Sequence, residues 1–260
     1  MYKNLSHTCV RKIKAKLHSL FSLPFRFNKN HGLGVQMSYI PDSYSKSGLY
    51  KEFNKLHESF SKSNERNNSG DISRLWSFIL NCNQILDERI EGDFVEVGVW
   101  RGNTASVLKY YAEKADRRLY LFDTYTGFDT KDITGIDADK SILFNDTSIE
   151  LVQSVVGAYD KCTYIKGVFP SSITEEVKNK KYAVVSIDCD LYEPTIQALN
   201  FFYPRMSWGG IFLLHDYSSG RWNGVKIAID EFCTQTHEHA ILIPDKSGSA
   251  FIRKSHQTHS

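Results

Sequence analysis

Two hydrophobic periods alternate along most of this chain. Short apolar runs, bounded by turn residues, occur at 94–97, 119–122, 163–166, 182–187 and 210–214. Such runs are typical of strands buried on both faces of a parallel sheet. Segments 103–115, 148–156, 193–203 and 224–234 lie between or after them and favour helices. Strands that alternate with helices predict a doubly wound α/β sheet.

Runs 240–243 and 250–252 predict a hairpin at the sheet edge, which makes a mostly parallel sheet of seven strands. Two helices are expected before the sheet. One has apolar residues at helical spacing from Leu49 to Phe60, and the other runs from a cap at Asp71 to about Glu88. We therefore divide the chain into an extension, 1–70, and a sheet domain, 71–260.

The extension begins with a basic arm. Residues 1–41 contain seven Lys or Arg and no Asp or Glu, so the other residues have 25 basic against 30 acidic side chains. Segment 9–21 predicts an amphipathic helix that ends before Pro24. It favours either peripheral contact with an anionic membrane surface or packing on the domain or on a second copy, and packing on protein is the commoner case. We expect a homo-oligomer and no nucleic-acid partner.

The cysteines and the apolar runs indicate the compartment. The five cysteines are widely spaced and form no CxxC pair, which favours free thiols in a reducing environment. No apolar run reaches the roughly 18 residues of a membrane span, and no charged segment leads into a long apolar one. The chain is therefore expected in the cytoplasm. The basic arm favours a location at the inner face of the membrane.

A glycine-containing turn, Glu96-Val-Gly-Val-Trp-Arg-Gly-Asn-Thr104, joins the first strand to its helix. Gly98 permits a tight turn and Gly102 a close approach. The spacing is neither the GxGxxG of dinucleotide folds nor a P-loop. Glu96 would repel a phosphate, whereas Asp123, 25 residues after Gly98, can accept hydrogen bonds from a ribose diol. Together they favour S-adenosylmethionine over NAD.

Acidic residues follow two further strands. Asp188 and Asp190 come after run 182–187, and His215 and Asp216 after run 210–214. Because the carboxyl ends of parallel strands share one edge, these groups should converge. Asp188, His215 and Asp216 suit a divalent cation, magnesium or manganese. Two alternatives remain, namely a metal-free site with His215 as general base, and acids that merely cap the following helix.

Several segments together resemble the macrocin O-methyltransferase family, whose members methylate sugar hydroxyls. The resemblance covers about 71–235 and is carried by Gly92-Asp-Phe-Val-Glu-Val-Gly-Val-Trp-Arg-Gly-Asn103, Leu121-Phe-Asp-Thr-Tyr125, Lys166-Gly-Val-Phe169, Ile187-Asp-Cys-Asp-Leu-Tyr-Glu-Pro-Thr195 and Tyr203-Pro-Arg-Met-Ser-Trp-Gly-Gly210. It implies the Rossmann-like class I methyltransferase fold, S-adenosylmethionine and Mg²⁺. Asp188 would be a metal ligand and Asp190 the general base, while His215 departs from the family's paired aspartates. The loop Thr126–Asn145 would be a substrate lid.

The resulting hypothesis is a methyltransferase that acts on a sugar hydroxyl of a glycan, nucleotide sugar or natural product. We expect Asp190 and His215 to be catalytic and Tyr217 and Trp222 to stack on the sugar. The expected cofactor-binding residues are Glu96, Gly98, Gly102, Asn103, Thr104, Asp123, Ser148 and Asp188. A nicotinamide-dependent oxidoreductase and a non-catalytic interaction module are the rival hypotheses.

Overall fold

The computed structural model describes residues 48–255, which lie in one compact unit, Asp42–Ser260. Segment 9–21 and the rest of the basic arm lie outside the described residues. None of the helices between 48 and 255 is both long and apolar enough to cross a bilayer.

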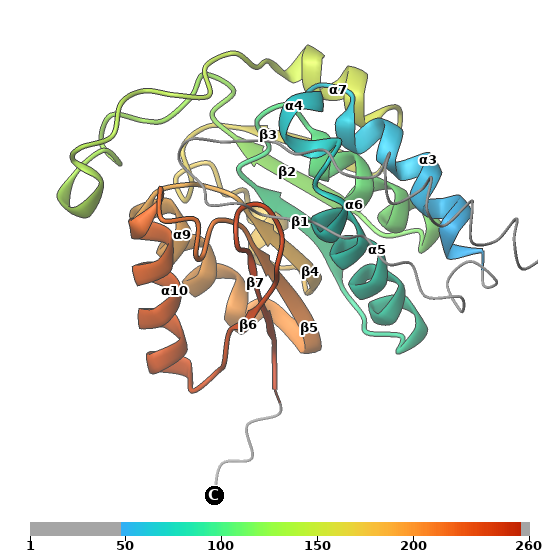
Figure 1. Cartoon of the computed structure of the whole chain (residues 1–260). Coiled ribbons are helices and arrows are strands. Elements are labelled where there is room, and N and C mark those ends of the chain that lie inside the picture. Colours follow the sequence, from blue (N-terminus) through green and yellow to red (C-terminus); the bar gives the residue numbers. More distant parts are fainter. Residues whose placement is uncertain (1–47, 256–260) are drawn as a thin grey trace, which may run out of the picture. The chain divides into compact units, whose positions relative to one another are not determined.

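One seven-stranded sheet organises this unit (Figure 1). Its strands are β1 (Asp93–Val97), β2 (Leu119–Asp123), β3 (Cys162–Lys166), β4 (Tyr182–Ile187), β5 (Met206–Leu214), β6 (Ile241–Leu242) and β7 (Ala250–Arg253). They lie in the order β3-β2-β1-β4-β5-β7-β6, and β7 runs antiparallel to β5 and β6. The expected sheet and edge hairpin are confirmed. The strand order reverses between β1 and β4, where open α/β sheets bind ligands.

Helices cover both faces of the sheet (Figure 1). One layer contains α3 (Leu49–Ser61), α4 (Glu65–Asn68), α5 (Ile72–Asp87), α6 (Asn103–Lys114) and α7 (Ile149–Val156); the other contains α8 (Glu175–Lys178), α9 (Tyr192–Phe202) and α10 (Asn223–Thr236). Two 3-10 turns, η1 (Gly135–Asp137) and η2 (Tyr203–Arg205), interrupt loops. The longer helices match the predicted ones. The four-residue helices α4 and α8 were not predicted, because one turn carries too little periodicity.

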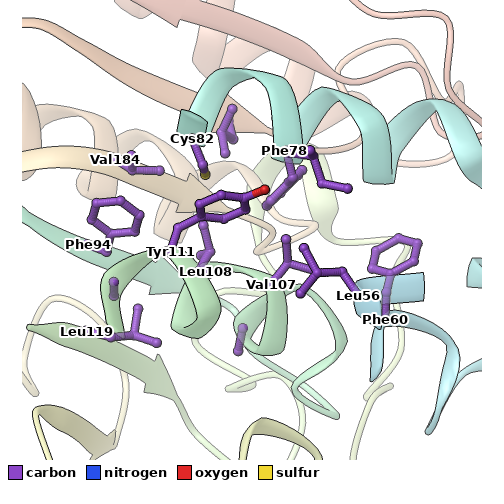
Figure 2. Packing of buried hydrophobic residues seen from close by; sticks show 14 of the residues in the cluster. Leu56, Phe60, Phe78, Cys82, Phe94, Val107, Leu108, Tyr111, Leu119 and Val184 are labelled. Atoms are coloured by element: carbon purple, nitrogen blue, oxygen red, sulfur yellow. The ribbon is translucent and has the colours of Figure 1, made fainter. Parts of the chain in front are cut away.

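Alternate strand residues feed two hydrophobic clusters. Phe94 of β1 points into the cluster under α5 and α6, whereas its neighbour Val95 points into the one under α9 and α10. In the first cluster, Tyr111 of α6 lies beside Cys82 of α5 and near Phe94 (Figure 2). The Tyr111 hydroxyl donates to Glu52 at 3.0 Å, so its burial leaves no unpaired polar group.

Helix α3 shares the core of the sheet domain. Phe53, Leu56 and Phe60 occupy one helical face and are buried in the same cluster as α5 and α6. The predicted extension, 1–70, therefore contains at least one helix, α3, that is integral to the domain.

Candidate active site

The glycine turn after β1 lies directly against the end of β4. A Cβ built on Gly98, whose φ is 85°, would stand 2.1 Å from the backbone carbonyl oxygen of Asp188. No side chain fits there, so the glycine keeps the turn and the acidic strand end in contact. Gly102, with φ of 79°, begins α6, and its Cβ would stand 3.0 Å from Val152 of α7. Gly98 thus permits close contact with backbone, and Gly102 permits close contact with valine side chains of α7.

Asp123 holds the glycine turn in place. Its Oδ2 accepts hydrogen bonds from the backbone N–H groups of Val99, at 2.8 Å, and Trp100, at 2.7 Å. Its Oδ1 accepts one from the Tyr125 N–H at 2.6 Å. The carboxylate is therefore ordered at the end of β2, where the sequence placed a ribose-binding acid. The Thr124 hydroxyl is a fourth neighbour, 3.4 Å from Oδ1, although it lies closer, at 2.5 Å, to the Gly127 carbonyl.

Glu96 is fully buried beneath the turn. The Ser186 hydroxyl donates to Glu96 Oε1 at 3.1 Å, while Oε2 has no hydrogen-bond partner among the described residues. Burial, helped by the nearby Asp188 charge, raises the pKa of Glu96 to about 8. Thr104 lies close enough for its hydroxyl to oppose that increase. An orphaned carboxyl oxygen at this point fits a cationic group such as the ammonium of S-adenosylmethionine.

Two other predicted cofactor residues have structural contacts here. Asn103 is buried, donates to the Phe60 carbonyl at 2.7 Å and accepts from the Ser63 hydroxyl at 2.7 Å, so it ties α6 to the end of α3. Ser148 caps α7 by accepting from the Leu151 N–H at 3.1 Å. These contacts explain both residue types without a ligand, and their cofactor roles stay predictions.

The acidic groups after β4 and β5 converge as expected. The strands pair in parallel up to Ile187 and Leu214, which brings the residues that follow side by side. His215 Nδ1 lies 2.9 Å from Asp188 Oδ1 and 2.7 Å from Asp216 Oδ2. Ligand atoms of these three residues lie within 4.8 Å of one another. Two carboxylates and an imidazole at this spacing fit a divalent cation.

Asp190 does not continue the alternation of β4. Its φ of 62° places the backbone in the left-handed region, as does the φ of 59° at Asp216. The two sharp bends set the buried Asp190 and Asp216 carboxyls close enough to repel each other. Cys189, between Asp188 and Asp190, donates its thiol hydrogen to the Val97 carbonyl at 3.4 Å. Burial raises the pKa of its thiol well above normal, which fits a structural residue rather than a nucleophile.

Arg74 of α5 also belongs to this site, and the sequence reasoning missed it. Its guanidinium lies 2.8 Å from Asp188 Oδ2, and the residue is 7% exposed. It occupies the apolar stripe of α5, next to Leu75 and one turn before Phe78. A lone cation on the buried face of a helix is the signal that could have identified it, because a buried charge requires a partner.

Burial and neighbouring charges together set the protonation within a group of four residues that we call the acidic rim: Asp188, Asp190, His215 and Asp216. Although burial acts to raise it, the His215 and Arg74 charges hold the pKa of Asp188 below its usual range. Burial and Arg74 act to lower the pKa of His215, but the Asp188 and Asp216 carboxylates raise it well above normal. Burial, and then repulsion by Asp216 and Asp188, raise the pKa of Asp190 well above normal. Both shifts favour the protonated forms of His215 and Asp190.

The loop after β2 closes against both halves of the site. The Phe144 ring centroid lies 5.2 Å from that of Trp100, in the glycine turn, and 6.1 Å from that of Trp222, which follows the acidic rim. Phe128 also meets Trp222, at 5.7 Å. Trp222, predicted to stack on a sugar, is thereby 4% exposed. Tyr217 donates to Asp230 of α10 at 2.6 Å.

The fold and these strand-end groups define the class of protein. The O-methyltransferase NovP has the same fold, with a TM-score of 0.64 and 21% identity over 80% of this chain and 99% of that one. A calicheamicin methyltransferase has a TM-score of 0.54 and is 18% identical, and the match covers 86% of this chain and 99% of that one. The structure is therefore a class I methyltransferase fold.

The chain belongs to the macrocin-O-methyltransferase (TylF) family, whose pattern it matches over residues 70–253. A mycinamicin III 3''-O-methyltransferase from Micromonospora griseorubida is 30% identical over 148 residues, 51% of this chain. An 8-demethyl-8-(2,3-dimethoxy-alpha-L-rhamnosyl)-tetracenomycin-C 4'-O-methyltransferase from Streptomyces olivaceus is 28% identical over 52% of this chain. The matches span 58% and 56% of those two relatives.

Proposed function

We propose that this protein is an S-adenosylmethionine-dependent O-methyltransferase that acts on a sugar hydroxyl. One observation carries the proposal: the glycine turn and the acidic rim are in direct contact, through Gly98 and the Asp188 carbonyl. A methyl donor held by the turn would therefore lie next to an acceptor held at the rim. The family and the sugar-modifying activities in the names of the two relatives support the acceptor class.

On the donor side, S-adenosylmethionine supplies the methyl group when bound. Glu96 Oε2 would accept a hydrogen bond from its ammonium, which would satisfy a buried oxygen that has no partner among the described residues. Asp123 would bind the ribose diol while it continues to hold the turn amides. Binding both ends of the donor fixes its orientation relative to the acidic rim, and such orientation accounts for much of an enzyme's rate acceleration.

On the acceptor side, Asp190 takes the proton of the sugar hydroxyl as the oxygen attacks. Its raised pKa makes the ionised carboxylate a stronger base than an exposed one, once its own proton has left. Asp188, His215 and Asp216 would hold a divalent cation that orients the hydroxyl and lowers its pKa.

A specific observation favours a metal-independent version of the same reaction. The Arg74 guanidinium already neutralises Asp188, and His215 lies between Asp188 and Asp216. In that version no cation binds, His215 takes the acceptor proton after losing its own, and Asp188 and Asp216 orient its ring.

A labelled-methyl transfer assay over nucleotide sugars, glycans and glycosylated natural products tests the function. Each acceptor is assayed in EDTA, in Mg²⁺ and in Mn²⁺, with the Asp190→Asn, His215→Gln and Glu96→Gln variants. Asp160→Asn, at an exposed position, is the matched control. Transfer that survives EDTA but is lost with His215→Gln supports the metal-independent version. A chain that binds S-adenosylhomocysteine yet methylates nothing in the panel would contradict the sugar assignment.

A further inference from the structure

Asp137 is buried in the middle of an otherwise accessible loop. It is 1% exposed, whereas its neighbour Ile136 is 45% exposed, and no other residue of the described segment 128–148 is classed as buried. A buried carboxylate is costly unless partners compensate for the lost water. The contacts of Asp137 therefore show what holds this loop in place.

The carboxylate lies at the start of two helices. The Tyr192 N–H, in the first turn of α9, donates to Asp137 Oδ2 at 2.7 Å. A Cβ on Gly224, in the first turn of α10, would stand 2.5 Å from the same oxygen. Neither helix has a side-chain cap of its own, because the N-cap residues are Leu191 and Trp222. An anion is stabilised at helix N-termini, so the loop supplies a cap to α9 and places the carboxylate beside the first turn of α10. The other carboxylate oxygen, Oδ1, has no hydrogen-bond partner among the described residues, so the contact with α9 is the hydrogen bond that holds this side chain.

These two helices are the ones that follow the acidic rim. Helix α9 begins just after Asp190, and α10 begins seven residues after Asp216. We propose that Asp137 is the latch that holds residues 126–145 closed over the acceptor side of the site, and so positions the acceptor. The acceptor role rests on the proposed function, whereas the closure of the loop does not.

The cofactor end of the loop is tethered independently. Asp146 accepts from the Trp100 indole N–H at 2.8 Å and pairs with Arg101 at 2.7 Å, and the Thr147 hydroxyl donates to the Trp100 carbonyl. None of these contacts involves Asp137. Loss of the latch should therefore loosen the acceptor side and leave cofactor binding unchanged.

A double-mutant cycle on the full chain tests the latch from both sides of the contact. Asp137→Ala removes the carboxylate, and Gly224→Ala displaces it, since the added Cβ would stand 2.5 Å from Asp137 Oδ2 and 2.9 Å from the Tyr192 backbone nitrogen that donates to it. Asp139→Asn is the matched control, because that side chain lies on the same loop and is 73% exposed. Asp137→Asn retains an acceptor oxygen and should be intermediate. Hydrogen exchange of the amides at 126–145 reports closure, and a thermal melt confirms that each variant is folded.

We expect Asp137→Ala and Gly224→Ala each to speed hydrogen exchange about 5- to 30-fold, which is the change that the loss of one helix cap would cause. The double variant should match the single ones, because both remove the same contact. The acceptor KM should rise by a similar factor, with S-adenosylhomocysteine affinity within about twofold. Unchanged exchange, or effects that multiply in the double variant, would overturn the latch. Faster exchange in a chain with no transferase activity would keep the latch and reject the proposed function.

Discussion

Glu96→Gln isolates the electrostatics of cofactor binding. Because the pKa of Glu96 is about 8 in the cofactor-free chain, roughly 0.9 of the molecules carry its proton at pH 7. The ammonium of the cofactor needs the ionised carboxylate as its partner. Binding should therefore release roughly 0.9 proton per site at pH 7. Between pH 6 and pH 7, where the cofactor amine stays protonated, affinity should rise about tenfold.

Titration calorimetry with S-adenosylhomocysteine in buffers of different ionisation enthalpy measures this release. Glu96→Gln should release no proton at pH 7, lose the pH dependence and bind about 30-fold more weakly, as expected when one charge-assisted hydrogen bond worth roughly 2 kcal/mol is lost. Asp123→Asn is the comparison, since it alters the ribose end and should keep the proton release. If the wild-type chain binds S-adenosylhomocysteine without releasing a proton, Glu96 does not meet the ammonium.

Three further changes test the rim, the stability and the core. Arg74→Met should cost about 3 kcal/mol of unfolding free energy in EDTA, because Asp188 loses one of its two buried partners and keeps only His215. Mn²⁺ should restore more stability to Arg74→Met than to Arg74→Lys. Equal responses of the two variants would place the cation elsewhere. The folded chain keeps the Glu96 proton up to about pH 8, whereas the unfolded chain loses it above about pH 4.5. Between these two pH values the free energy of unfolding should therefore fall by about 1.4 kcal/mol per pH unit as the pH rises. Urea titrations measure this slope, and Glu96→Gln should remove it. Phe60→Ala should cost about 3–5 kcal/mol by denaturant unfolding, and a negligible loss would mean that α3 is not integral to the core.

Strand-end chemistry was readable from the sequence because it follows from local pattern. The apolar runs before Asp123, Asp188 and His215 predict buried parallel strands, and such strands end on one edge of a sheet. The strand order and the antiparallel β7 agree with that expectation. The roles of the individual side chains stay predictions, and the structure adds that Asn103 and Ser148 have structural partners of their own.

The sequence by itself thus determined the class of fold, the glycine turn and the set of acids at the rim, since each is encoded within a few neighbouring residues. Only the tertiary structure decided which charges meet. Arg74 is 114 positions from Asp188, and Asp137 is 55 from Tyr192. Each belongs to an element whose own periodicity says nothing about its partner. A buried charge pairs with the group that tertiary packing places within about 3 Å of it. That proximity is a property of the folded chain.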